Sequence, residues 1–339
     1  MYEAMPSQAN PDSWVKSSDT IRKLPDLAIL GLRSARWLVY ERRLRERLRR
    51  GEYDIYHETS FTPSNHGGTV PQVFTLHDLS LMHYAQYHPK ERVWFFKLFF
   101  ERRLARADTI IVPSEFIGRE VRETLKLPES KVAVIPEAPD PFFSRRSPEA
   151  IRSVREKLSL PDEYILFVGT LEPRKNLDLL IDAMALCESK VPLVLTGWQG
   201  WGDKPWVEKA RKSGVLPRIH RTGYIDEESL ACLYSDALAM IYPSHYEGFG
   251  LPVLEAMACG TPVICSNAAS LPEAGGDAAL YVDPNDADDL AAKIDRVLTD
   301  QETRRTMAEQ GLLHASRFSW SDVAVRTVDV FRQAASSKS

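Results

Sequence analysis

Short apolar segments alternate with amphipathic segments along almost the whole chain, and this alternation limits the fold more than any other feature of the sequence. The apolar segments are rich in Val, Ile, Leu and Phe, which favour strands, while the segments between them repeat apolar residues at helical spacing. Strands that alternate with helices form parallel sheets covered by helices. We therefore predict an α/β fold, with strands at residues 53–58, 71–78, 108–114, 131–136, 163–170, 192–197, 218–225, 238–244, 261–266 and 278–283.

The alternation is interrupted at residues 137–150 by a stretch rich in Pro, Ser and charged residues, which is typical of a linker. A chain of 339 residues is long enough for two domains. We predict two α/β domains with a cleft between them, at residues 1–140 and 141–316. The helical segment at residues 317–339 lies beyond the last strand, and we assign it to the first domain.

Composition excludes several classes of protein. The formal net charge of −4 argues against a general nucleic-acid binder. The sequence has neither an apolar run of about 18 residues, as a membrane-spanning helix needs, nor the basic and apolar order of a signal peptide at its start. The cysteines form no CxxC pair and lie in apolar context, so we expect reduced core residues and a cytoplasmic protein; they are Cys187, Cys232, Cys259 and Cys265.

A basic segment near the start of the chain has two readings. Residues 33–50 contain eight arginines with Trp37 and several leucines between them. One reading is a solvated helix with an apolar face. The other is contact with an anionic membrane surface, which the aromatic and basic residues of segment 90–106 also favour.

The segment HYEGFGLPVLEAM, residues 245–257, predicts an anion site. It follows a predicted strand, and Pro252 suits the first turn of a helix because its missing N–H would be unpaired there anyway. A glycine-rich loop that opens onto a helix N-terminus presents unpaired N–H groups and favours a negative charge. Two carboxylates, Glu247 and Glu255, flank this loop.

A second segment carries positive charge at the end of another strand. In FVGTLEPRKN, residues 167–176, Gly169 allows a ligand to approach the backbone, and Arg174 and Lys175 follow. Arg offers a planar fork to phosphate oxygens and Lys a mobile charge, so the pair suits a diphosphate. A solvated surface pair is the alternative, but open α/β sheets bind ligands at the carboxyl ends of their strands.

Together these segments resemble the retaining glycosyltransferases of family 4, which have the GT-B fold of two Rossmann-like domains. The resemblance covers essentially the whole second half, and its first-half motifs are similar to the bacterial mannosyltransferases that build surface polysaccharides. The motifs are GTLEPRKN (169–176), GYI (223–225), PS (243–244), EGFGLP (247–252), EA (255–256), GTPV (260–263), LPE (271–273), TLHDLS (75–80), YHPKERV (87–93) and VPSEF (112–116).

The resemblance implies a role for each motif. Glu255 would accept hydrogen bonds from the ribose hydroxyls of a nucleotide, Glu247 would hold hydroxyls of the donor sugar, and Arg174 and Lys175 would stabilise the departing diphosphate. His77 would face the sugar from the first domain, although a His-Asp pair is more often structural. The other donor-binding positions would be Gly169, Tyr224, Ile225 and Ser244, with the backbone of Gly248, Phe249, Gly250 and Leu251.

The start of the chain departs from the family pattern. Residues 1–30 contain no glycine and no convincing strand, whereas family members begin with a strand and a glycine-rich loop. The sequence begins to match the family pattern near residues 33–58. We therefore expect the first βα unit to be absent. In the family this unit helps to bind the acceptor, so its absence would change acceptor binding.

The predicted function is transfer of a hexose, with mannose from GDP-mannose as our first choice, to a glycan or lipid-linked glycan with retention of configuration. No metal or other cofactor is expected, because no third ligand stands near His77 and Asp78. The place of action would be the cytoplasm, including the inner face of the membrane. A transferase for a UDP-sugar and a non-catalytic nucleotide-sugar binder stay open, whereas a dehydrogenase is disfavoured because no GxGxxG follows an early strand.

Overall fold

The structure is a computed structural model that describes residues 25–198 and 205–337. The chain forms two compact units. Unit 1 consists of Met1–Val112, Gly118–Val134 and Arg326–Ser339, and unit 2 of Pro113–Ile117 and Ile135–Val325. A short piece of the first half of the chain, Pro113–Ile117, thus packs with the second unit.

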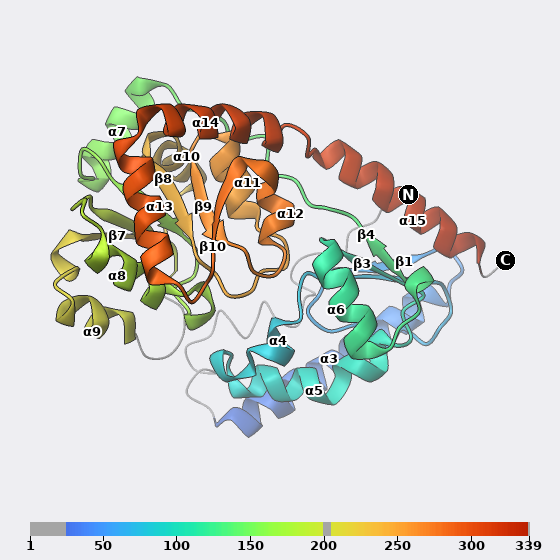
Figure 1. The fold of residues 1–339 in the computed structure, drawn as a ribbon. Coiled ribbons are helices and arrows are strands. Elements are labelled where there is room, and N and C mark those ends of the chain that lie inside the picture. The colour runs from blue at the N-terminus through green and yellow to red at the C-terminus, as the bar shows by residue number, and fades with distance from the viewer. Residues whose placement is uncertain (1–24, 199–204, 338–339) are drawn as a thin grey trace. The chain divides into compact units, whose positions relative to one another are not determined.

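Unit 1 contains a parallel sheet whose strands are arranged in sequence order, β1-β2-β3-β4 (Figure 1). The central strands are almost completely buried, since helices must cover both faces of a parallel sheet. The strands are β1 (Tyr56–Glu58), β2 (Gln72–Thr75), β3 (Thr109–Val112) and β4 (Val132–Val134).

Two long helices of unit 1 are joined by an aromatic contact and a buried ion pair. In α3 (Asp26–Leu48), Trp37 packs edge-on against Phe95 of α5 (Lys90–Leu104), with ring centroids 5.4 Å apart. Glu41 of α3 forms a buried ion pair of 2.8 Å with Arg103 of α5. The other helices are α4 (Ser80–His83), η2 (Ala85–Tyr87), α6 (Glu115–Leu125), η3 (Glu129–Lys131) and α15 (Trp320–Ser336), which continues from unit 2 into unit 1.

The first helix or strand in the described residues is α3, and β1 follows it. The predicted absence of a strand from residues 1–24 concerns a segment outside the described residues and stays a prediction.

Unit 2 contains a six-stranded parallel sheet in the order β10-β9-β8-β5-β6-β7 (Figure 1). This is the doubly wound order, in which the direction of winding reverses between the first and fourth strands. Here the reversal falls between β5 and β8, which are adjacent. The strands are β5 (Ile165–Val168), β6 (Leu193–Thr196), β7 (Ile219–Gly223), β8 (Ala239–Tyr242), β9 (Val263–Ser266) and β10 (Ala279–Val282).

Some helices of unit 2 begin with a side-chain cap. The Asp226 carboxylate accepts a hydrogen bond from the Ser229 N–H at the start of α10, and Asp286 does the same for Asp289 in α13. The helices are α7 (Pro148–Leu158), η4 (Pro173–Lys175), α8 (Leu177–Leu186), α9 (Pro205–Lys212), η5 (Leu216–Arg218), α10 (Glu227–Asp236), α11 (Leu251–Ala258), α12 (Leu271–Gly275), η6 (Gly276–Ala278), α13 (Ala287–Thr299) and α14 (Gln301–Ala315).

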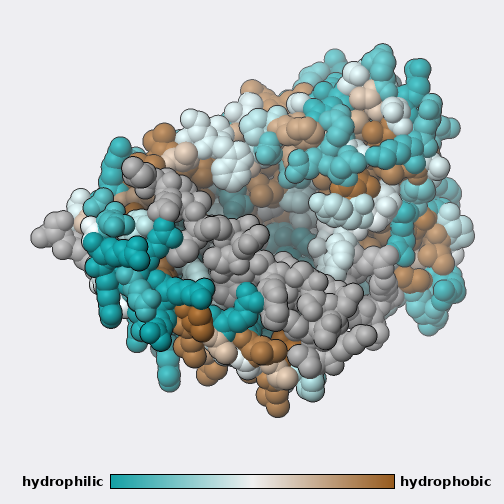
Figure 2. Space-filling view, turned by 180° about the vertical axis from the view of Figure 1, so that it is seen from behind, coloured by the Kyte–Doolittle hydropathy of each residue, from teal (hydrophilic) through white to brown (hydrophobic). Residues whose placement is uncertain are grey.

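The observed elements confirm the predicted alternation. Every predicted strand contains an observed strand, and the predicted helical segments 33–50, 90–106 and 115–126 correspond to α3, α5 and α6. The four cysteines are buried and unpaired in the described part of the chain. Among the described residues, no helix is both long enough and apolar enough to cross a bilayer. Hydrophobic residues on the face in Figure 2 form scattered patches between hydrophilic ones.

Candidate functional site

The candidate site lies in unit 2, where the winding of the sheet reverses. The loop after β5 carries residues 169–176, and the loop after β8 carries residues 243–250. The two loops are bonded to each other, because the His245 N–H donates to the Arg174 carbonyl and the Asn176 amide donates to the Pro243 carbonyl at 3.1 Å. The carboxyl ends of two adjacent strands therefore hold both predicted motifs in one place.

One carboxylate binds both predicted cations. The Lys175 ammonium donates to Glu247 Oε1 at 2.6 Å, and Nη1 of Arg174 donates to Glu247 Oε2 at 3.0 Å. The three side chains are 9–12% exposed. The structure thus brings Arg174, Lys175 and Glu247 into direct contact.

Two further side chains hold the cations, and sequence reasoning assigned them no role. Glu172 Oε1 accepts hydrogen bonds from Nε and Nη2 of Arg174, at 3.1 and 2.6 Å. The Tyr242 hydroxyl accepts from the Lys175 ammonium at 2.7 Å. Glu172 stands two residues before Arg174, which is the only signal in the sequence; Tyr242 looks like an ordinary residue of a buried strand.

The cluster of Glu172, Arg174, Lys175 and Glu247 is formally neutral. Burial acts to raise the pKa of Glu247, but the charges of Lys175 and Arg174 outweigh it and hold that pKa at about 2. Burial lowers the pKa of Lys175, against the attraction of Glu247. An anionic ligand here would find two ordered cations already aligned by carboxylates.

The loop that follows Glu247 presents its N–H groups and not its carbonyls. The Ser270 hydroxyl bonds to the carbonyls of Glu247 and Phe249 at 2.8 and 2.9 Å, and the Ser114 hydroxyl donates to the Gly248 carbonyl at 2.8 Å. In the described part of the chain, the N–H groups of residues 248–251 donate no hydrogen bond that the structure shows. They are therefore available to oxygen atoms of a ligand at the start of α11.

Gly250 and the side chain of Phe249 maintain the conformation of this loop. Gly250 has a φ of +120°, and a Cβ there would lie 2.9 Å from Leu271, so glycine is required. The Phe249 ring is buried against Phe318. At Phe249 only the backbone is left to contact a ligand.

Glu255 lies on the next turn of α11 with a partner from α10. The Tyr234 hydroxyl donates to Glu255 Oε2 at 3.0 Å. Burial raises the pKa of Glu255 to about 7, helped by Asp140 and Glu227 and opposed by the Tyr234 hydrogen bond. The carboxyl therefore changes its charge near neutral pH, which sequence reasoning did not predict.

Glycines line the carboxyl ends of three neighbouring strands, β5, β6 and β7. Gly169, Gly197 and Gly223 have φ of +145°, +129° and +73°, and a Cβ on Gly197 would lie 2.2 Å from the Gly169 carbonyl oxygen. After Gly223, the Tyr224 side chain is 84% exposed, whereas Ile225 packs on the core. An exposed aromatic ring in this place suits stacking on a base.

Ser244 is completely buried in the loop after β8. Its hydroxyl makes no well-aligned hydrogen bond among the described residues, although it lies close enough to Glu247 to help lower the pKa of that carboxyl. A buried hydroxyl without a well-aligned hydrogen bond is unfavourable, so this group gains from a polar ligand atom that reaches it.

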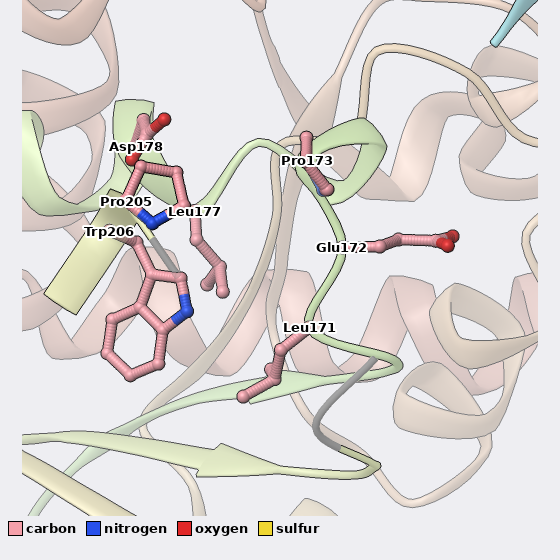
Figure 3. A pocket seen from close by; sticks show the side chains of 7 residues that line it. All are labelled: Leu171, Glu172, Pro173, Leu177, Asp178, Pro205 and Trp206. Atoms are coloured by element: carbon pink, nitrogen blue, oxygen red, sulfur yellow. The ribbon is translucent and has the colours of Figure 1, made fainter. Parts of the chain in front are cut away.

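A small cavity with apolar and polar lining lies beside the loop after β5 (Figure 3). Leu171, Leu177 and Trp206 line it, and the Glu172 carboxylate points away from these side chains (Figure 3). That carboxylate bonds to Arg174 instead. The cavity shares only Glu172 with the cluster of Glu172, Arg174, Lys175 and Glu247.

His77 belongs to unit 1, in the loop after β2, and its side chain is exposed. The neighbouring Asp78 accepts a hydrogen bond at 2.8 Å from the N–H of Ser80, the first residue of helix α4. Within the described residues, no group of three or more His, Cys, Asp or Glu side chains is arranged to hold a metal ion.

Comparison with known proteins agrees with this geometry. Residues 151–313 match the family model described as glycosyl transferases group 1, and residues 7–141 match the model described as glycosyltransferase family 4. The O-antigen chain mannosyltransferase B of Escherichia coli is 37% identical over 303 residues, which cover 87% of this chain and 78% of that protein. The serotype-specific mannosyltransferase WbdA of Escherichia coli is 32% identical over 81% of this chain and 35% of that protein.

Solved structures show the same fold. Sucrose-phosphate synthase from Thermosynechococcus elongatus is similar with a TM-score of 0.71 at 25% identity, over 94% of this chain and 82% of that one. Anabaena HepE in complex with UDP and glucose has a TM-score of 0.67 at 21% identity, over 86% and 81% of the two chains. The chain therefore belongs to the family 4 glycosyltransferases, which have the GT-B fold.

Proposed function

We propose that this glycosyltransferase moves mannose from GDP-mannose to a glycan or lipid-linked glycan, with retention of configuration and without a metal ion. The observation that supports a nucleotide-sugar site is the contact of Arg174 and Lys175 with Glu247 beside unpaired N–H groups at the start of α11. The choice of mannose rests on the Escherichia coli O-antigen mannosyltransferase, which is 37% identical.

In the proposed reaction, the bond between the anomeric carbon and the diphosphate oxygen breaks, and its electron pair leaves with the diphosphate. The acceptor hydroxyl oxygen bonds to the anomeric carbon on the same face, and its proton passes to a departing phosphate oxygen. Arg174, Lys175 and the N–H groups of residues 248–251 stabilise the growing negative charge. Glu247 holds sugar hydroxyls, Glu255 the ribose and His77 the sugar from unit 1.

The test is transfer from a panel of labelled nucleotide sugars, with the anomeric configuration of the product read by NMR and with chelator present. We expect turnover with GDP-mannose and its loss in the double variant Arg174→Ala, Lys175→Ala. The matched control is Arg211→Ala with Lys212→Ala, a second Arg-Lys pair, exposed on α9 of the same unit. An unchanged rate in the first variant would contradict the proposal.

Two other outcomes have a defined meaning. Preference for a UDP-sugar would replace the proposed donor; Anabaena HepE, a protein of the same fold, was solved with UDP and glucose. Binding of a nucleotide sugar without turnover on any acceptor would favour a non-catalytic binder.

We also propose that unit 1 contacts an anionic membrane surface through α3 and α5. The solvent-exposed side chains of α3 change from apolar to basic along the helix. Leu32, Leu38 and Val39 are 43–54% exposed. The exposed Arg42 and Arg43 follow them. The helices lie side by side (Figure 1), and α5 adds exposed Trp94 and Leu98 with Lys97 and Arg102. Apolar side chains beside basic ones fit the boundary of a bilayer with acidic lipids.

Sedimentation with vesicles tests this surface. The protein should bind phosphatidylglycerol vesicles more strongly than phosphatidylcholine vesicles, and Leu38→Glu with Val39→Glu should abolish the difference. Leu313→Glu, at an exposed leucine of α14 in unit 2, is the matched control. Equal binding by both variants would rule out this face.

A further inference from the structure

Three tyrosines lie completely buried in one core of unit 2, and their hydroxyls have different partners. Tyr164 is 0% exposed and donates to the Leu233 carbonyl at 3.1 Å, an ordinary use of a buried hydroxyl. Tyr234 and Tyr242, 0% and 1% exposed, bond instead to Glu255 and Lys175. Two of the three hydroxyls therefore contact charged residues of the candidate site.

We propose that Tyr234 and Tyr242 are positioning residues, which fix the ribose-binding Glu255 and the diphosphate-binding Lys175 from inside the core. The inference rests on the proposed function, since it assigns these two charged residues to a nucleotide diphosphate. Both rings are held by the core around them; Tyr234, for example, packs edge-on against Phe143 at 5.9 Å between centroids. A hydroxyl group on such a ring therefore has a fixed position, and its hydrogen bond fixes the position of the partner.

Tyr242 orients the lysine. An ammonium has three N–H donors in tetrahedral arrangement. The Tyr242 hydroxyl and Glu247 Oε1 take two of them, at 2.7 and 2.6 Å. The direction of the third N–H of Lys175 is then determined, and that donor is the one left for a phosphate oxygen.

Tyr234 orients the carboxylate and favours its charged form. Its hydroxyl donates to one oxygen of Glu255, which fixes the plane of the carboxyl group for two ribose hydroxyls. The titratable groups that interact with this carboxyl are Tyr234 and Glu227 of α10, Asp140 before α7, Tyr242 of β8 and Cys259 at the end of α11. Both acids disfavour its ionised form and Tyr234 favours it, so loss of the hydroxyl raises the pKa of Glu255 further.

The experiment measures affinity for GDP, UDP and inorganic pyrophosphate by calorimetry between pH 6 and 9 in Tyr234→Phe, Tyr242→Phe and the control Tyr164→Phe. We expect Tyr234→Phe to weaken nucleotide binding about tenfold at pH 7, to spare pyrophosphate, and to regain only part of the affinity at pH 9, where Glu255 is ionised but still lacks the hydrogen bond that orients it. Tyr242→Phe should weaken nucleotide and pyrophosphate alike at every pH. Tyr164→Phe should change neither.

A double-mutant cycle separates positioning from a general effect on the fold. If Tyr234 acts through Glu255, Tyr234→Phe has no further effect on nucleotide affinity in the Glu255→Gln background. Equal behaviour of Tyr234→Phe and Tyr164→Phe, or full additivity in the cycle, would overturn the inference while leaving the proposed function intact. Unchanged nucleotide affinity in Glu255→Gln itself would instead remove the proposed function, and this inference with it.

Discussion

Replacing Glu247 with Gln tests the electrostatic balance of the candidate site. The substitution keeps the size of the side chain and one oxygen acceptor, but it removes the charge that faces Lys175 at 2.6 Å and Arg174 at 3.0 Å. Loss of one partner from a buried ion pair costs about 3–5 kcal/mol. Because the amide oxygen still accepts one hydrogen bond, we take the lower value, which lowers the melting temperature by roughly 6–12 °C.

The same variant should bind pyrophosphate more tightly. The cluster with Glu172 changes from formally neutral to one positive charge, so an anion gains attraction and also replaces the missing carboxylate. We expect at least about tenfold higher affinity for inorganic pyrophosphate, equal to about 1.4 kcal/mol, together with at least about 100-fold slower sugar transfer.

Thermal unfolding with and without pyrophosphate, and calorimetry, measure both effects. The control is Glu302→Gln, which removes an exposed carboxylate paired with Arg305 on α14 and should leave both quantities unchanged. An unchanged melting temperature, or weaker pyrophosphate binding, in Glu247→Gln would refute the electrostatic account.

Four further predictions concern Glu255, the ion pair of unit 1 and Tyr224. Since ribose hydroxyls donate to an ionised carboxylate, nucleotide affinity should rise with pH up to about 7, the pKa of Glu255, and then level off, while calorimetry of Glu255→Gln shows no such dependence. Unfolding of the ligand-free protein should become easier as pH rises toward 7, because the raised pKa lets the folded state hold a proton that the unfolded state loses; Glu255→Gln should lessen that trend in urea titrations. Glu41→Gln removes the carboxylate that pairs with the buried Arg103 and should destabilise unit 1 by about 3 kcal/mol in urea titrations; a loss below about 1 kcal/mol, as for an exposed pair, would contradict this. Tyr224→Ala should lower nucleotide affinity about tenfold without changing pyrophosphate affinity; a loss for both ligands would contradict stacking on the base.

Most of the fold could be predicted from the sequence because a buried parallel strand is a continuous apolar run between turn residues. Segment 238–244, for example, contains β8 at Ala239–Tyr242. The site could be predicted in part for a related reason: Arg174 and Glu247 follow strands that the doubly wound order makes neighbours.

The parts of the candidate site that the sequence did not predict depend on contacts between residues far apart in the chain. Tyr234 and Ser270 look like ordinary core residues, and only the folded structure shows that their hydroxyls reach Glu255 and the carbonyls of residues 247 and 249. Residue type also does not show that the Glu247 carboxylate binds both Arg174 and Lys175. The packing of Pro113–Ile117 with unit 2 is also long-range: Glu273 accepts hydrogen bonds at 2.7 Å from the N–H groups of Glu115 and Phe116.

The most direct measurement is a crystal structure of the protein with GDP, or with UDP if only that nucleotide binds. We predict diphosphate oxygens within hydrogen-bond distance of Arg174, Lys175 and the N–H groups of residues 248–251, with the ribose hydroxyls on Glu255. A nucleotide bound elsewhere, with the contacts of Glu247 to both cations unchanged and no anion beside them, would contradict the account.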